Sequence, residues 1–315
     1  MFMNYEKAYR VMDEVKKVIK GKDPVIEKIM MAILAGGHVL LEDIPGVGKT
    51  SLALSFSKAM GLDFNRIQFT PDVVASDIVG FSKYDQKEDE FVYEPGVVMC
   101  NLLLADEINR TSSRTQAALL EVMEEKNVTV DGKTYTLPKP FHVIATQNPI
   151  GSYGTQALPQ SQLDRFMIKT SLGYPDFESQ VELLNDRQKE HPLEKVEPVM
   201  TREELLSLQA EVQAIYIDEK ILRYITELTE ATRNHPSVLQ GISPRGAIAL
   251  SHIVKAKAFL EKRDYVNADD VRSLFVDTCS HRMVLHAKIN DEQVEELLQS
   301  ILESTKSPEV EELKV

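Results

Sequence analysis

The sequence contains few cysteines and no long apolar segment. Only Cys100 and Cys279 occur among its 315 residues, which is too few for a disulfide framework. No apolar run approaches the roughly 18 residues that a membrane-spanning helix needs. Residues 1–20 mix charged and apolar positions from the start, unlike a signal peptide. We therefore expect a soluble globular protein with no membrane segment, located in the cytoplasm.

The sequence is also short of positive charge and of metal-ligand patterns. Lys and Arg number 36 against 49 Asp and Glu, which gives a formal net charge of -13. A nucleic acid or an anionic membrane would repel that average charge, so nucleic acid is not an expected partner. The seven histidines and two cysteines show no metal-ligand spacing. At about 150 residues per domain, the length predicts roughly two domains.

The most informative stretch runs from His38 to Met60. The apolar run 39–41 predicts a strand, a glycine-containing loop follows, and a helical pattern begins at Lys49. Gly46 and Gly48 allow the main chain to curl so that backbone N–H groups converge on an anion at the start of a helix. This arrangement predicts a phosphate-binding loop that accepts a nucleoside triphosphate.

Individual residues of this loop have expected roles. Lys49 would reach the β- and γ-phosphates, and the Thr50 hydroxyl would ligate Mg²⁺. The usual spacing has glycine five residues before Gly48, where this chain has Asp43. Taken alone, the imperfect match could be a turn that caps a helix, but the strand before it and the amphipathic helix after it favour the phosphate loop. The predicted nucleotide contacts are Pro45, Gly46, Val47, Gly48, Lys49, Thr50 and Ser51.

A second apolar run, Val97 to Ala105, ends in two adjacent acids, Asp106 and Glu107. This is the Walker B pattern, in which a buried strand delivers acids beside the phosphates. Asp106 would hold Mg²⁺ through water, and Glu107 would orient and deprotonate the attacking water. Adjacent acids could instead mark an exposed turn. The phosphate loop upstream favours the catalytic interpretation.

Two further polar positions follow predicted core strands. Asn148, after the strand 141–145, could hydrogen-bond the attacking water or the γ-phosphate, although Asn-Pro is also a common turn. Arg165 precedes a strand at 166–170. It could form a salt bridge to Asp164 or face the nucleotide of a neighbouring subunit, and its spacing does not choose between these alternatives.

Outside these motifs, the sequence predicts two hairpins and a helical C-terminal part. One hairpin flanks a charged, solvated tip at 86–90, and the other turns at Asp131-Gly132. Ser243-Pro244 starts a helix and places Arg245 in its first turn, as a candidate second sensor. The remaining expectations are helices at 5–19, 23–35, 49–60, 73–79, 111–125, 176–189, 201–214, 218–233, 243–262, 267–284 and 291–303, a strand at 66–69, and a mobile tail at 304–315.

Five motifs in order, LEDIPGVGKT, LLLADEINR, ATQNP, QLDRF and ISPRG, resemble those of the AAA+ ATPases, and specifically of the MoxR family. The resemblance covers nearly the whole chain. It implies an α/β fold: an AAA+ P-loop NTPase core with a five-stranded parallel sheet, followed by an all-α lid domain. Residues 1–173 would form the core with two β-hairpin inserts, and residues 174–315 the lid and a short C-terminal tail.

The resemblance also implies roles for single residues. It makes Lys49 and Thr50 the Walker A pair and Asp106 and Glu107 the Walker B pair, and it tolerates Asp43. Three more residues receive roles by position: Asn148 as sensor 1, Arg165 as the arginine finger and Arg245 as sensor 2. Arg110 and Arg114 remain competing fingers.

For function, the resemblance implies an enzyme that hydrolyses ATP with Mg²⁺. Such proteins usually form hexameric rings and often act beside proteins with von Willebrand factor A domains, as chaperones that mature or load cofactors into protein clients. The alternatives are a nucleic-acid motor, which the tip residues Asp131 and Lys133 do not favour, and a slow nucleotide-switched binding module. A small-molecule kinase is least consistent with the helical C-terminal part.

Overall fold

A five-stranded parallel sheet lies at the centre of the core, in the strand order β2-β5-β8-β1-β9. The computed structural model describes residues 4–87, 89–148, 157–189, 192–286 and 291–308. The expected α/β class and the five-stranded parallel sheet are confirmed. The strands of the sheet are β1 (Val39–Glu42), β2 (Phe64–Gln68), β5 (Leu102–Asp106), β8 (His142–Gln147) and β9 (Ile168–Thr170).

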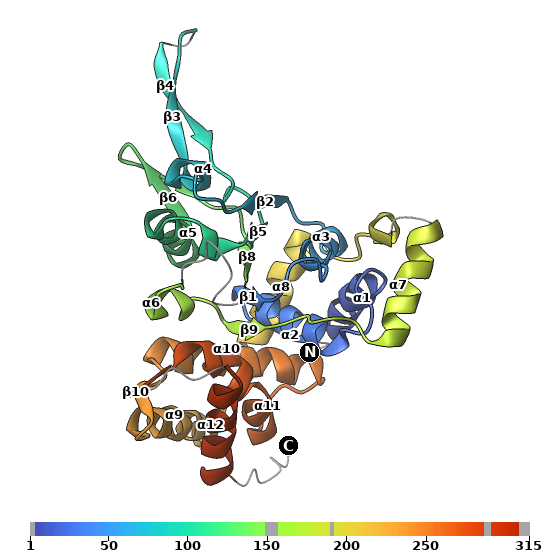
Figure 1. Cartoon of the computed structure of the whole chain (residues 1–315), viewed down its shortest axis with the longest axis vertical. Coiled ribbons are helices and arrows are strands. Elements are labelled where there is room, and N and C mark those ends of the chain that lie inside the picture. Colours follow the sequence, from blue (N-terminus) through green and yellow to red (C-terminus); the bar gives the residue numbers. More distant parts are fainter. Residues whose placement is uncertain (1–3, 88, 149–156, 190–191, 287–290, 309–315) are drawn as a thin grey trace.

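Helices cover both faces of this sheet because both faces of its strands are apolar. Leu102 and Leu104 pack with the first three helices, whereas Leu103 and Ala105 pack on the opposite side with α5. The covering helices lie on the two sides of the sheet in Figure 1. They are α1 (Tyr5–Lys16), α2 (Asp23–Leu34) and α3 (Lys49–Ala59) on one side, and α4 (Ala75–Val79), α5 (Ser113–Glu125) and the short α6 (Gln160–Leu163) on the other.

The second half of the described chain is mainly helical, as expected. Four of its helices begin at a side-chain cap: for example, Thr201 and Glu204 form a capping box, and Ser243 caps the helix that carries Arg245. These helices are α7 (Phe177–Lys189), α8 (Arg202–Gln213), α9 (Glu219–Asn234), α10 (Pro244–Leu260), α11 (Ala268–Cys279) and α12 (Asp291–Ser304). Short 3-10 turns occur at η1 (Ile108–Arg110), η2 (Pro192–Lys195) and η3 (Ser280–Arg282).

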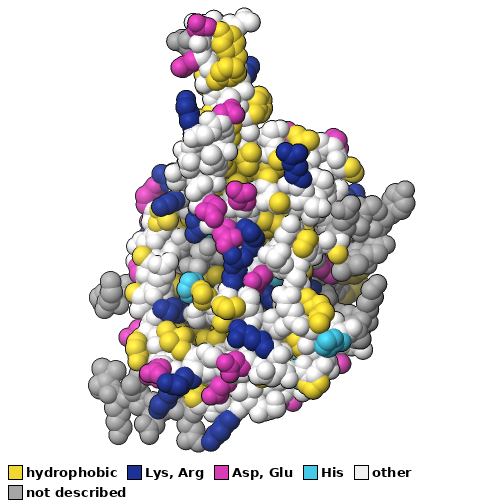
Figure 2. Space-filling view, turned by 90° about the vertical axis from the view of Figure 1, so that its left-hand side faces the viewer, with side chains coloured by type: hydrophobic (Ala, Val, Ile, Leu, Met, Phe, Trp, Pro, Cys, Tyr) yellow, Lys and Arg dark blue, Asp and Glu magenta, His cyan; other side chains and the backbone are white. Residues whose placement is uncertain are grey.

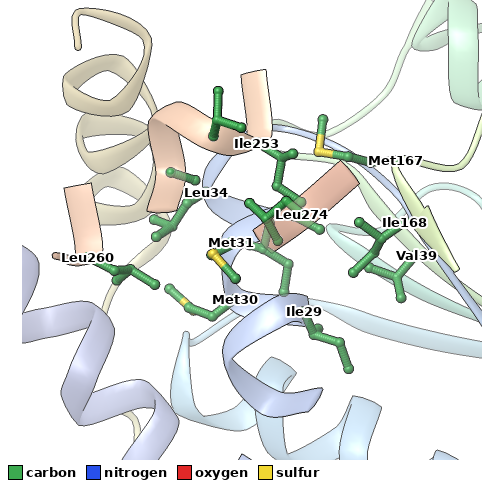
Figure 3. Close-up of a cluster of buried hydrophobic side chains, with 14 of the residues drawn as sticks. Ile29, Met30, Met31, Leu34, Val39, Met167, Ile168, Ile253, Leu260 and Leu274 are labelled. Carbon is green, nitrogen blue, oxygen red and sulfur yellow. The ribbon is translucent and has the colours of Figure 1, made fainter. Parts of the chain in front are cut away.

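The C-terminal helices pack directly on the core. Figure 3 shows side chains of α2, among them Met31 and Leu34, gathered with Ile253 of α10 and Leu274 of α11. Met167 and Ile168, from the edge strand and the residue before it, join the same buried cluster. The edge of the sheet at β9 and the C-terminal helices therefore share one hydrophobic core.

Both predicted hairpins are confirmed, and they project on the same side of the molecule (Figure 1). The longer one is β3 (Gly80–Asp85) with β4 (Glu90–Pro95), and the shorter is β6 (Asn127–Val130) with β7 (Lys133–Thr136). The rings of Tyr93 and Tyr135 stack with centroids 4.0 Å apart, which joins the two hairpins. Large apolar side chains stay exposed on the longer one, visible at the top of Figure 2.

Several boundaries differ from the expectation. The strand predicted at 97–105 begins only at Leu102, because residues 97–101 form turns. Ser112 rather than Thr111 caps α5, since its hydroxyl accepts the N–H of Thr115 whereas the Thr111 hydroxyl donates to the Val73 carbonyl. The small sheet of β10 (Val238–Gln240) and β11 (Val284–Leu285) was not predicted. Of the predicted tail, residues 309–315 lie outside the described residues.

No helix in the part of the chain that the structure describes is both long enough and apolar enough to span a membrane.

Candidate functional site

The loop between β1 and α3 has the backbone that its glycines predict. Gly46 has φ 89° and Gly48 has φ 101°, a left-handed conformation that favours glycine. Gly48 is also the residue before the first turn of α3. The backbone N–H groups at this helix start have no partners within the helix, so the loop and the helix end together form an anion cradle.

Lys49 is buried at the start of α3, and its ammonium group is held by the loop itself. The Nζ atom donates to the carbonyl oxygens of Asp43 at 2.9 Å and Ile44 at 3.3 Å. Burial lowers the pKa of Lys49, while the negative charges of Asp43, Asp106 and Glu107 oppose that shift. The loop thus concentrates positive charge close to three carboxylates.

Asp106 ends β5 and is bound by two side chains from neighbouring strands. Its Oδ1 accepts a hydrogen bond from the Thr146 hydroxyl at 2.6 Å, and its Oδ2 lies 2.7 Å from Nη2 of Arg66. Thr146 comes from β8 and Arg66 from β2, the two strands that flank β5 in the sheet. The carboxyl end of the sheet therefore fixes the orientation of this carboxylate.

Glu107 follows immediately, with a left-handed φ of 58°. Its backbone N–H donates to the same Thr146 hydroxyl oxygen at 2.9 Å, and its Oε1 accepts from Nδ2 of Asn148 at 3.2 Å. Nη1 of Arg110 lies 3.1 Å from Oε2. A left-handed glutamate costs about 1–3 kcal/mol, and such strain is concentrated at functional sites. The structure thus brings Asp106, Glu107 and Asn148 together around Thr146.

A cavity of about 320 Å³ opens beside the phosphate loop. One wall is the loop and another is the chain after α1, where Val18, Ile19 and Lys22 line the space. The third wall comes from Gly173 to Pro175 and from α7. The phosphate loop and apolar side chains such as Val18 and Ile19 line the same cavity, a combination that suits a nucleotide.

Oxygen donors near the loop suit Mg²⁺. Thr50, partly buried in the first turn of α3, carries a hydroxyl, and Asp106 carries a carboxylate whose two oxygens already have partners. Among the described residues, no group of three or more His, Cys, Asp and Glu side chains converges as a metal site. Mg²⁺ commonly binds one or two protein oxygens together with waters and substrate phosphates, so this donor set fits it.

Arg165 and Arg245 lie together, and not at this cavity. Both pair with Glu124 at the end of α5: Nη1 of Arg165 lies 2.7 Å from Oε2, and Nη2 of Arg245 bonds Oε1. With Met123 they line a surface hollow of about 130 Å³. Glu124 of this hollow comes from α5 and Arg165 follows α6, whereas the cavity is lined by residues of α3 and α7. Figure 1 shows α5 and α6 on the opposite side of the molecule from α3 and α7. Basic and acidic side chains are interspersed on that face in Figure 2.

The structure excludes one of the two alternatives for Arg165, the salt bridge to Asp164. The salt bridge to Asp164 does not form, because Asp164 pairs with Arg282 at 2.8 Å and accepts a hydrogen bond from Ser243 at 2.7 Å. Of the competing arginines, Arg110 pairs with Glu107, and Arg114 is exposed at the start of α5. Pro149, on which the turn alternative for Asn148 depends, lies outside the described residues.

Three contacts of this site were not expected from the sequence. Thr146 bridges the two acids, Arg66 pairs with Asp106, and the Asp43 side chain bonds the backbone after β9. The position of Thr146, near the end of β8 and two residues before Asn148, was a usable signal. Nothing local in the sequence marks Arg66, because its partner is 40 residues away.

Comparisons with known proteins agree with this geometry. Residues 38–168 match the family model of the "ATPase family associated with various cellular activities (AAA)", and residues 230–301 match the AAA lid domain. Chaperone MoxR1 of Mycobacterium tuberculosis is 37% identical over 96% of this chain and 82% of its own length. Protein YeaC of Bacillus subtilis is 48% identical over 95% of this chain and 94% of its own. The crystal structure of a putative ATPase from Cytophaga hutchinsonii superposes with a TM-score of 0.87 at 37% identity, covering 97% of this chain and 96% of that one.

Proposed function

Because the chain belongs to the MoxR family of AAA+ ATPases, we propose that it binds ATP with Mg²⁺ and hydrolyses it to ADP and phosphate. The observation that carries this proposal is the cluster of Asp106, Glu107 and Asn148 around the Thr146 hydroxyl, at the same edge of the sheet as the phosphate loop. The nucleotide would occupy the cavity between that loop and α7, with its base against Val18 and Ile19.

In this proposal each residue has one task. The residues from Pro45 to Ser51 cradle the phosphates, and Lys49 exchanges the Asp43 and Ile44 carbonyls for phosphate oxygens. Thr50 and Asp106 would hold Mg²⁺, which neutralises phosphate charge when bound. Glu107 accepts a proton from the attacking water, and Asn148 orients the Glu107 carboxylate through the hydrogen bond at 3.2 Å.

We further propose that catalysis needs a neighbouring subunit. Arg165, and with it Arg245 as sensor 2, would approach the nucleotide of an adjacent copy in a hexameric ring. Their common site on Glu124, on the opposite side from the cavity, supports this role. Apolar residues of α7 beside the cavity, Phe177, Val181 and Leu184, are exposed and would be covered by that neighbour. Arg110 and Arg114 are the alternative fingers.

We propose that hydrolysis drives the remodelling or maturation of a protein client in the cytoplasm, for example by insertion of a metal or cofactor. A von Willebrand factor A domain protein is the proposed partner, and nucleic acid is not. One argument for a protein client is the relative that is named as a chaperone. A second is the set of apolar side chains that are 43–68% exposed on the longer hairpin: Phe81, Tyr84, Phe91 and Val92. The proposed moving parts are a core, residues 1–173, and a lid, residues 174–315.

The experiment is ATP hydrolysis per subunit across a protein dilution series, for wild type and Arg165→Ala. Specific activity that rises with concentration in wild type, together with an assembled but inactive variant, supports a shared active site. An arginine finger contributes about 10³ to 10⁵ in rate, so the difference is easily measured. Activity independent of concentration and an unaffected variant would contradict the shared site.

A slow nucleotide-switched binding module is the second candidate. The observation in its favour is that Asn148 and Arg110 both bind the Glu107 carboxylate within one subunit, which restrains the proposed base. Slow turnover in fully assembled rings, with tight ATP binding, would favour this candidate over the remodelling ATPase.

A further inference from the structure

Asp43 stands where the usual phosphate loop has glycine, and its side chain has a specific set of partners. The residue is buried directly after β1. Its backbone connects the sheet to the loop: its N–H donates to the carbonyl of Gln147, the last residue of β8, at 3.2 Å, and its carbonyl oxygen accepts from Lys49. Its carboxylate accepts the backbone N–H groups of Leu172 and Gly173, the latter at 3.1 Å.

The segment that Asp43 holds carries one wall of the nucleotide cavity. Gly173 has a left-handed φ of 59°, and it leads through Tyr174 and Pro175 into α7. All three of these residues line the cavity, opposite Val18 and Ile19. On its other side the segment is held by Lys22, whose Nζ donates to the Tyr174 carbonyl at 2.7 Å. The wall is thus attached to the phosphate loop by Asp43 and to the chain after α1 by Lys22.

A glycine at position 43 could not make this connection. The buried N–H of Leu172 would lose its acceptor, and an unsatisfied buried donor is costly. Hydrogen bonds to a charged acceptor are also about twice as strong as neutral ones, so the carboxylate suits two N–H donors.

We propose that Asp43 is a positioning residue for the base-binding part of the cavity: it fixes the turn at Leu172 to Pro175 against the phosphate loop, so that the base and phosphate subsites form together. This inference rests on the proposed nucleotide binding. The base subsite depends on the Asp43 side chain, whereas the phosphate cradle depends on the backbone of Gly46 and Gly48 and on Lys49. Loss of the carboxylate therefore weakens the binding of ATP far more than it weakens the binding of the triphosphate group alone.

The test is calorimetric titration of the full-length protein with MgATP and, separately, with magnesium tripolyphosphate. In Asp43→Gly, two hydrogen bonds to a charged acceptor are lost, so ATP affinity should fall roughly 10- to 100-fold. Tripolyphosphate affinity should change by less than about threefold, a shift of under 1 kcal/mol. Asp43→Asn, which keeps one acceptor oxygen, should recover part of the ATP affinity and guards against misfolding of the glycine variant.

Asp131→Asn, the same change of charge at the tip of the shorter hairpin, is the matched control and should bind both ligands like wild type. Equal loss of ATP and tripolyphosphate affinity in Asp43→Gly would overturn the inference, because Asp43 would then act on the phosphate cradle. Unchanged ATP affinity would overturn it as well. Wild type that binds ATP and tripolyphosphate equally would show that there is no base subsite, which also overturns the inference. Wild type that binds neither ligand would contradict the proposed nucleotide site itself, and this is recognised before any variant is compared.

Discussion

The side chains of Asp164 and Arg282 form a buried ion pair, with Nε of Arg282 2.8 Å from Oδ1 of Asp164. Arg282 also donates to the carbonyl oxygens of Phe166 and Met167, so one guanidinium joins η3 to the chain that enters β9. Ser243, the cap of α10, donates to the other oxygen of Asp164. This pair therefore holds the C-terminal helices against the β9 edge of the sheet. Asp164 is the residue immediately before Arg165.

We predict a large loss of stability when one member of this pair is removed. Arg282→Gln leaves a buried carboxylate without its cation, so the free energy of unfolding should fall by about 3–5 kcal/mol. Urea denaturation followed by circular dichroism measures the change. The control is Arg223→Gln, which breaks an exposed pair with Glu219 and should cost at most about 1 kcal/mol. Equal effects of the two substitutions would contradict a structural role for the buried pair.

We predict that Thr146→Val slows hydrolysis without weakening nucleotide binding. Its hydroxyl donates to Asp106 and accepts the N–H of Glu107, and valine keeps the shape while removing both bonds. A hydrogen bond to a charged group is worth about 1.5–3 kcal/mol, so kcat should fall roughly 10- to 100-fold. Thr146→Ser keeps the hydroxyl and should stay close to wild type. A valine variant with normal kcat would show that the two acids are held by other contacts.

We predict that two inactive variants restore activity when mixed. Glu107→Gln lacks the proposed base but keeps Arg165, and Arg165→Ala has the reverse defect. If Arg165 acts on the neighbour's nucleotide, rings formed from both proteins contain some complete sites, and hydrolysis reappears. The measurement is phosphate release after mixing and reassembly. Mixtures as inactive as the separate variants would place the finger in its own subunit, or at Arg110 or Arg114.

We predict that the protein loses stability as the pH falls below neutrality, because buried histidines, among them His38 and His142, are neutral. Burial lowers the pKa of His38 to about 3 and that of His142 to about 4. Nδ1 of His38 accepts from the Val143 N–H, and Nε2 of His142 lies 3.0 Å from the amide nitrogen of Gln209. Each of these nitrogens faces an N–H donor, so neither can take up the proton that would charge its ring.

The direction of this pH dependence follows from the number of protons that the folded and unfolded states bind. Unfolded histidine binds its proton near pH 6.5 and the folded protein does not, so stability is fully present above that pH and falls as the pH drops toward 4. Between pH 7 and pH 5 the cost is about 2 kcal/mol per histidine. Urea midpoints at the two pH values measure it in wild type and in His142→Gln, whose dependence should be shallower. His235→Gln, at a partly exposed site, is the control and should retain the wild-type dependence.

Much of the fold was predictable because its signals are local. Glycine at positions 46 and 48 marks the left-handed turns of the phosphate loop, and Asp131-Gly132 marks the shorter hairpin. Apolar runs ending in Asp106 or near Asn148 locate strands of the sheet, since buried parallel strands are continuously apolar. The predicted boundaries of elements were wrong where a local pattern was ambiguous: residues 97–101 are as apolar as a strand but form turns.

The sequence by itself determined the phosphate loop, the order of the motifs and the kinds of groups that reach the site, since each depends on neighbouring residues. Only the tertiary structure decided which of those groups touch. Thr146 hydrogen-bonds Asp106 across 40 residues of chain, and Asp43 hydrogen-bonds Gly173 across 130. Glu124 forms ion pairs with both Arg165 and Arg245. The physical reason is strand order: β5, β8 and β1 lie side by side although they are far apart in sequence, and no local pattern encodes that neighbourhood.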